Sequence, residues 1–114
     1  MEQAPAGSVR VTDEVIASIA ALAAREIEGV ADMDEPSARH LGDWLKRQTA
    51  HRGVRVMIDG DRAIHLEVFL TVGSSAAVAR VAEQVQTNVV EAVERMLGLE
   101  VAEVDVFVSS VAFA

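Results

Sequence analysis

The sequence contains no cysteine, and this absence excludes several kinds of site at once. Disulfides, thiolate metal sites, iron–sulfur clusters and cysteine nucleophiles cannot form without it. Among the 114 residues there is no tyrosine, and aromatic residues make up only 4%. No apolar run approaches the roughly 20 residues that a membrane helix needs, and the first residues lack the basic-then-apolar pattern of a secretory signal. We therefore expect a cytoplasmic protein that does not insert into a membrane.

Basic residues are also scarce. Ten Lys and Arg stand against 18 Asp and Glu, which gives a net charge of −8. An acidic domain repels nucleic acid and anionic lipid on average. The bases are concentrated within 39–55, however, and we interpret this stretch as a basic docking patch for an acidic partner, made of Arg39, Lys46, Arg47, Arg52 and Arg55. The alternative is a solvated charged segment beside a hairpin.

Apolar periodicity predicts the main elements. Residues at helical spacing predict a helix over about 13–28, with Thr12 as its N-cap and Gly29 after its end; the expected buried stripe is Val15, Ile16, Ile19, Leu22, Ala23 and Ile27. Strict alternation on both sides of Asp59-Gly60 predicts a hairpin whose return strand covers 64–72. A valine stripe predicts a long helix over about 75–97, capped by Ser74-Ser75 and ended by Gly98.

Three shorter segments complete the order of elements. Residues 8–11 and 30–33 are predicted as short extended pieces, and 37–48, with Trp44, as a short helix; Leu99 begins a last strand. The order β-α-(β-α)-β-β-α-β predicts an α+β two-layer domain, a small mixed or antiparallel sheet of 3–5 strands with two main helices on one face. Whether 8–11 and 30–33 join the sheet stays open. We expect a disordered terminus over 1–6 and a single domain over 7–112.

The sequence offers no arrangement of residues that supports catalysis. His40, His51 and His65 lack the spacing of a zinc helix, and we interpret each as a lone surface histidine. No serine lies in a G-x-S-x-G elbow, and no glycine-rich loop could cradle phosphate. We therefore expect neither an enzyme nor a cofactor, metal or small-molecule substrate.

The predicted sheet has one face without helices, and this face favours protein binding. Phe69 and Phe107 lie on it among charged residues, and the segment 104–113, VDVFVSSVAF, combines strong β character with little charge and no proline. As an edge strand it would pair with another chain, unless another element of the protein covers it. The predicted partner-binding residues are Phe69, Val104, Val106, Phe107 and Val108. The two phenylalanines could instead stack on RNA bases, but the carboxylates of Glu67, Glu103 and Asp105 on the same face would repel phosphate.

Three blocks of the chain resemble the bacterial alkaline-shock-protein and general-stress-protein envelope family. The first, GSVRVTDEVIASIAALAAREIEGVADM, is similar to the family's Gly-x-Val-x-Ile-x-x-Glu-Val-Ile start and its Glu-Val-Glu-Gly-Val step. The second, RGVRVMIDGDRAIHLEVFLTVG, resembles the family hairpin, and VARVAEQVQTNVVEAVERMLGLEVAEVDVFV resembles its long helix and last strand. The step Gly73-Ser74-Ser75 departs from the family's acidic-aromatic-Gly loop.

The resemblance implies a function that composition does not. Members of the family are small non-enzymatic cytoplasmic proteins linked to cell-envelope stress. Some are held at the inner face of the membrane by a membrane-anchored partner, and some self-assemble. We expect a scaffold or adaptor of the envelope stress response that acts by self-association and by docking to a membrane-anchored protein. The alternative is a small RNA-binding module.

Overall fold

The computed structural model describes residues 10–34 and 51–113. Its elements are α1 (Asp13–Arg25), β1 (Val30–Met33), β2 (Val54–Ile58), β3 (Ile64–Gly73), α3 (Val78–Leu97) and β4 (Val101–Ala112). The predicted segment at 30–33 does join the sheet, as β1, whereas Arg10 and Val11 belong to no strand. The predicted helix over 37–48, with Trp44, lies outside the described residues.

The sheet is mixed and is organised around β3. On one side β2 pairs with residues 64–68 and β1 with residues 70–72, both antiparallel, and on the other side β4 pairs in parallel along the whole of β3. Phe69 joins the two short strands, because its N–H donates to Gly53 O at 2.8 Å and its carbonyl accepts from Asp34 N–H at 2.8 Å. β1 and β2 therefore act as one interrupted strand beside β3.

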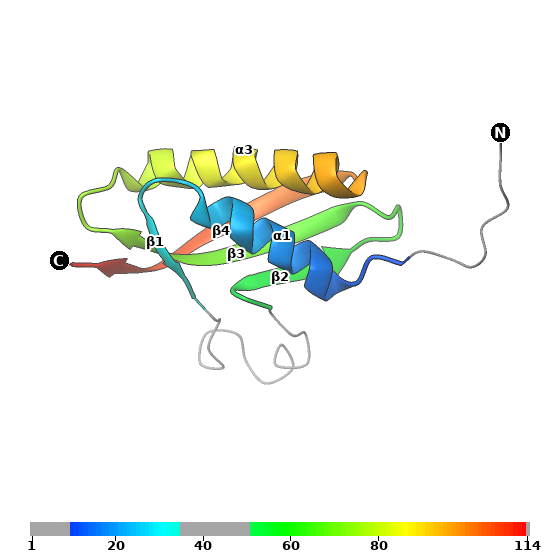
Figure 1. The fold of residues 1–114 in the computed structure, drawn as a ribbon, viewed down its shortest axis with the longest axis horizontal. Coiled ribbons are helices and arrows are strands. Elements are labelled where there is room, and N and C mark those ends of the chain that lie inside the picture. Colours follow the sequence, from blue (N-terminus) through cyan, green and yellow to red (C-terminus); the bar gives the residue numbers. More distant parts are fainter. Residues whose placement is uncertain (1–9, 35–50, 114) are drawn as a thin grey trace, which may run out of the picture.

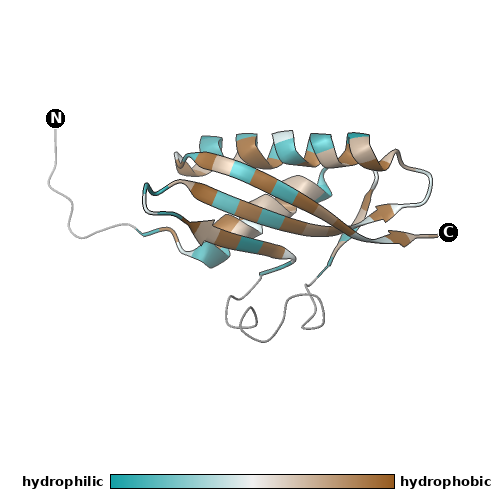
Figure 2. Cartoon of the chain, turned by 180° about the vertical axis from the view of Figure 1, so that it is seen from behind, coloured by the Kyte–Doolittle hydropathy of each residue, from teal (hydrophilic) through white to brown (hydrophobic). Residues whose placement is uncertain are grey.

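Both helices cover the same face of the sheet, and Figure 1 shows α3 beside β4 with α1 crossing the other strands. The residues of β3 that face the helices are buried to 1% exposure or less: Ile64, Leu66, Val68, Leu70 and Val72. The valines Val81, Val85 and Val89 of α3 complete this core. The predicted α+β two-layer class and the predicted faces of β3 are confirmed. On the opposite face, brown and teal residues alternate along the strands (Figure 2).

α1 differs from the prediction in its length and in its buried residues. The helix ends at Arg25, with Glu26 as its C-cap, rather than at 28. Val15 and Leu22, predicted to be buried, are 44% and 62% exposed. The buried side chains are Ile16, Ala17, Ala20, Ala21, Ala23 and Ala24. Alanine lets a helix backbone approach its neighbours closely, and the alanine face is therefore buried in place of the larger side chains.

The start of α3 also departs from the prediction. Its N-cap is Ala77, which makes no side-chain capping bond, so the expected cap by Ser74-Ser75 is wrong. The backbone N–H of Ser74 donates to Ala112 O and that of Ala76 donates to Gly73 O. These bonds hold the serines in the turn after β3. The predicted stop at Gly98 is confirmed, with a left-handed φ of 67°.

Candidate protein-interaction site

The predicted aromatic pair lies at the centre of the sheet face that no described helix covers. Phe69 and Phe107 are register partners on β3 and β4, and their rings stack with centroids 4.9 Å apart and an interplanar angle of 12°. Phe69 is 7% exposed and Phe107 is 44% exposed. Because Phe69 is covered, the pair offers the solvent one aromatic surface, that of Phe107, instead of a two-ring platform for bases.

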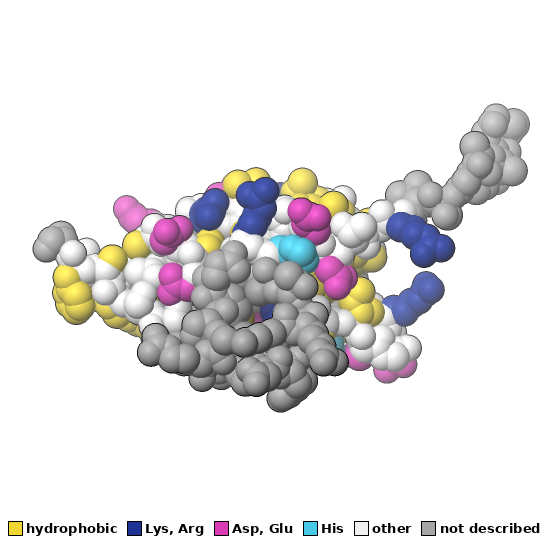
Figure 3. Space-filling model, turned by 90° about the horizontal axis from the view of Figure 1, so that it is seen from below, with side chains coloured by type: hydrophobic (Ala, Val, Ile, Leu, Met, Phe, Trp, Pro, Cys, Tyr) yellow, Lys and Arg dark blue, Asp and Glu magenta, His cyan; other side chains and the backbone are white. Residues whose placement is uncertain are grey.

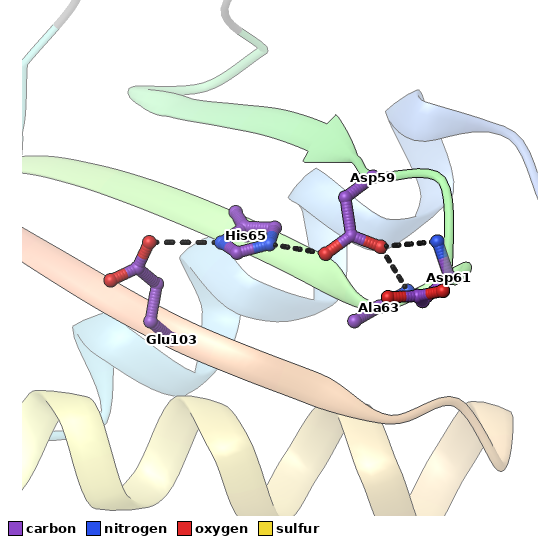
Figure 4. A network of polar contacts seen from close by, with 5 residues as sticks. All are labelled: Asp59, Asp61, Ala63, His65 and Glu103. Atoms are coloured by element: carbon purple, nitrogen blue, oxygen red, sulfur yellow. Dashed lines mark hydrogen bonds and ion pairs between the residues drawn. The ribbon is translucent and has the colours of Figure 1, made fainter.

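His65 lies between two carboxylates at one end of this face (Figure 4). Its Nε2 is 2.8 Å from Asp59 Oδ2 and its Nδ1 is 2.9 Å from Glu103 Oε1. Ionised carboxylate oxygens only accept, so both contacts are hydrogen bonds at the same time when the ring is a doubly protonated imidazolium. The interpretation of His65 as a lone surface histidine is therefore wrong.

His65 and Asp59 shift each other's pKa, and Glu103 adds to the shift of His65. The hydrogen bond to Asp59 and then the one to Glu103 raise the pKa of His65 above 6.5. The bond from His65 is also the largest cause that lowers the pKa of Asp59 below 3.8. The other oxygen of Asp59, Oδ1, accepts from the N–H groups of Asp61 and Ala63 at 2.9 and 3.0 Å. His65 thus ties the β2–β3 turn, through Asp59, to the start of β4, through Glu103.

Arg55 does not belong to a surface patch. It is 6% exposed and forms an ion pair with its register partner Glu67 on β3. Its Nε and Nη1 have no hydrogen-bond partner among the described residues. This overturns the predicted role of Arg55 in docking, because alternation on a strand indicates the face of a side chain but not its burial. Arg52 is exposed, and Arg39, Lys46 and Arg47 lie outside the described residues.

A hydroxyl cluster crosses the same face at its other end. Asp34 accepts from Thr71 Oγ1 at 2.9 Å, from Ser110 Oγ at 3.3 Å and from the hydroxyl of Ser109. Thr71 Oγ1 and Ser110 Oγ also lie 2.6 Å apart. The cluster joins the end of β1 to β4 across β3. Most polar groups of the face thus bind one another, which leaves few for a ligand.

The free edge of β4 is the part of this surface that remains open. In the described part of the chain, β4 pairs with β3 alone. Two side chains of α3 reach its first half: Glu94 Oε2 accepts from Val101 N–H at 3.1 Å, and Gln86 Nε2 donates to Val104 O at 3.0 Å. Neither contact extends past Val104, so the edge beyond it keeps main-chain groups that another strand could bind.

The predicted partner-binding residues divide into two kinds. Val104 is buried, and Val106 and Val108 pack against the core, so these three could offer a partner only their main chain. Among the five, only Phe107 exposes its side chain substantially. Hydrophobic side chains also gather at the end of the molecule where β4 ends (Figure 3), where Phe113 is exposed.

The described residues offer little for small ligands or metals. One open hollow of about 480 Å³ lies between the end of α1 and α3, lined by Glu26, Ile27, Glu28, Glu83, Gln84, Thr87 and Asn88. The amide of Asn88 is already used, since it donates to Ala23 O and Glu26 Oε1. Within the described residues no group of three potential ligands could hold a metal ion, and no helix is long and apolar enough to cross a membrane.

Comparisons with known proteins agree with the resemblance noted in the sequence. Residues 1–113 match the alkaline shock protein 23 family, which is described as having a cell envelope-related function. The chain is 31% identical over 107 residues to the uncharacterized protein YloU of Bacillus subtilis, covering 92% of this chain and 88% of that protein. It is 29% identical to YqhY of the same organism (94% and 78% covered) and 28% identical to Spy1614 of Streptococcus pyogenes (92% and 88%). No solved structure matches the chain.

Proposed function

The chain belongs to the alkaline shock protein 23 family, whose function is related to the cell envelope, and on this premise we propose that it is a non-enzymatic scaffold or adaptor of the bacterial envelope stress response. It acts by self-association and by docking to a membrane-anchored protein. In this proposal it works in the cytoplasm, at the inner face of the membrane, through that partner.

The observation that carries self-association is the free edge of β4. The strand is 12 residues long, whereas β1 and β2 on the opposite side have four and five residues. Long unpaired edges bind other strands, and short edges resist such pairing. β4 of a second copy is a suitable occupant. If two copies pair antiparallel about Phe107, the two exposed rings meet and Asp105 faces the stretch around Ser109 instead of another Asp105, which limits repulsion between two acidic chains.

The arrangement of the open face supports a binding role without catalysis. His65, Arg55 and Asp34 are each held by charged or hydroxyl side chains of neighbouring strands. Phe69 is covered, and the exposed Asp105 lies two residues before Phe107 on β4. A negative charge beside the exposed ring disfavours a nucleic-acid backbone, which argues against the RNA-binding alternative.

Light scattering of the purified chain tests self-association. We expect wild type to form an oligomer and Phe107→Asp to reduce its size, because a charge at the centre of the paired edge must be desolvated. The matched control is Met96→Asp, since Met96 is 59% exposed on α3, and it should assemble like wild type. Unfolding curves confirm that both variants fold. An oligomer of unchanged size in Phe107→Asp would rule out this edge.

Flotation of cell membranes tests docking to an anchored protein. The tagged chain is mixed with washed membranes of its native bacterium and, separately, with vesicles made from the extracted lipids. We expect it to float with the membranes, to be released after protease treatment of their exposed proteins, and to remain unbound to the vesicles. Binding to lipid vesicles alone, or recovery with RNA that nuclease removes, would contradict the proposal.

A further inference from the structure

α1 turns its large aliphatic side chains outward and its alanines inward. Leu22 is 62% exposed and Val15 is 44% exposed, while Ile19 between them is only partly buried. The side chains toward the sheet and α3 are Ile16 and five alanines. A helix of an isolated domain normally buries its larger apolar residues, so this distribution leaves a part of α1 without a partner among residues 10–34 and 51–113.

The outward residues form one continuous stripe. Val15, Ile19 and Leu22 are spaced four and three residues apart, and such residues lie above one another on the same side of a helix. Rotating α1 would not hide them, because its alanine face is already packed closely against the sheet and α3. Aliphatic residues at this spacing are the contacts through which one helix binds another.

The stripe is bordered by negative charge. Asp13 and Glu14 lie in the first turn of α1, and Glu26 and Glu28, which also line the hollow toward α3, follow its last turn. Two bases lie near them: Arg10 is exposed three residues before Asp13, and Arg25 is 4.0 Å from the carboxylate of Asp32, which partly neutralises it. A partner that covers the stripe must place its own flanks against these acidic groups, and a basic flank gains from the contact.

We propose that this stripe of α1 is a docking site for a basic amphipathic helix of a protein partner. The proposal gives a place and a chemistry to the partner of the proposed function, and in that respect rests on it. It does not involve β4, since α1 packs against α3, β1 and β2 at the far side of the sheet. An anionic membrane is a poorer occupant, because it would bring like charge to the acidic border, and the concentration series below distinguishes a second copy of this chain.

Titration with synthetic helices tests the site on the full chain. Backbone amide NMR spectra are recorded as three peptides are added: an amphipathic helix with a lysine-rich flank, the same apolar pattern with a glutamate-rich flank, and the lysine-rich composition with its apolar pattern scrambled. We expect the first peptide alone to shift the signals of α1. Val15→Ser/Leu22→Ser should weaken its binding about tenfold or more, the size of loss expected when hot-spot residues at the centre of an interface are truncated.

Two further sets of variants keep the test interpretable. The matched control, Val78→Ser/Met96→Ser, changes two exposed apolar residues of α3 and should bind like wild type. Glu14→Gln/Glu28→Gln leaves the stripe intact and should weaken binding of the lysine-rich peptide as well. This pair decides the question if the first double variant fails to fold.

Several outcomes would overturn the proposal. The peptide results would do so if the stripe variant bound the lysine-rich peptide as well as wild type does, or if the glutamate-rich or scrambled peptide bound as well as the lysine-rich one. The NMR signals of α1 would do so if they shifted on addition of anionic vesicles, or as the concentration of the chain itself was raised. Loss of peptide binding with intact membrane flotation would remove only this site. Intact peptide binding with failed flotation would instead remove the anchored partner of the proposed function.

Discussion

Replacing Arg55 by methionine tests how the strands hold the open face together. Arg55 is 6% exposed and the side chain of its partner Glu67 is 18% exposed. Removing one member of a buried ion pair costs about 3–5 kcal/mol, because the other charge stays behind without compensation. Water reaches Glu67 in part, which reduces this penalty. We expect Arg55→Met to lower the free energy of unfolding by about 2 kcal/mol.

Replacing both residues should reverse most of that loss. The wild-type guanidinium leaves Nε and Nη1 without partners in the described part of the chain, and an unsatisfied buried donor costs about 1–3 kcal/mol. Arg55→Met/Glu67→Leu removes these donors together with the stranded carboxylate. We expect the double variant to lie within about 1 kcal/mol of wild type, or to be more stable.

Urea unfolding of wild type, the two single variants and the double variant at pH 7 gives the coupling energy of the pair. Arg52→Met is the control, since Arg52 is exposed, and it should change stability by less than about 0.5 kcal/mol. A neutral Arg55→Met together with strictly additive single effects would refute the reasoning, because the ion pair would then contribute nothing.

Two further predictions concern His65 and Gly29. The pKa of His65 is raised in the folded chain, so its contribution to stability is complete below about pH 6.5 and is lost as the pH rises through the folded value. Relative to His65→Gln, wild type should therefore lose stability as the pH rises from about 6.5 through the folded pKa, and parallel pH profiles would contradict the contacts with Asp59 and Glu103. Gly29 has φ +107°, and a Cβ there would lie 2.6 Å from Val81 Cγ2. Gly29→Ala should cost about 2–4 kcal/mol in urea unfolding, and a loss below about 1 kcal/mol would show that the loop shifts freely.

Periodicity predicted the fold because burial on the strands follows a period of two. Every residue from Ile64 to Val72 lies on its predicted face, and the hairpin at Asp59 and the stop at Gly98 are in place. The same reasoning predicted the wrong buried residues for α1, because this helix has large aliphatic residues on one side and alanines on the other. Hydrophobicity favours Val15 and Leu22 for the interior, whereas packing distance favours alanine, and a single sequence does not show which of the two the neighbouring elements require.

The contacts of the open face needed a register that the sequence does not give. Phe69 and Phe107 were assigned to the correct face, but their stacking depends on parallel pairing with β4 at a particular offset. His65 and Asp59 are six residues apart across a predicted hairpin, so the sequence pattern could have predicted this hydrogen bond. Its second bond, to Glu103, joins residues 38 apart. Local sequence patterns do not predict contacts between residues so far apart in the chain.

The two proposed surfaces can be occupied at the same time, because they lie on different elements of the fold. β4 forms one edge of the sheet, and α1 packs over the opposite strands. A copy paired along β4 therefore leaves the stripe of α1 open, and a helix on α1 leaves the edge of β4 open. A pair of copies would then present two stripes at once, and bivalent binding raises overall avidity by about 10²–10⁴ without any new contact. Weak contacts on a small acidic domain would suffice to hold an assembly at anchored partners, and the assembly would disperse once pairing along β4 is lost.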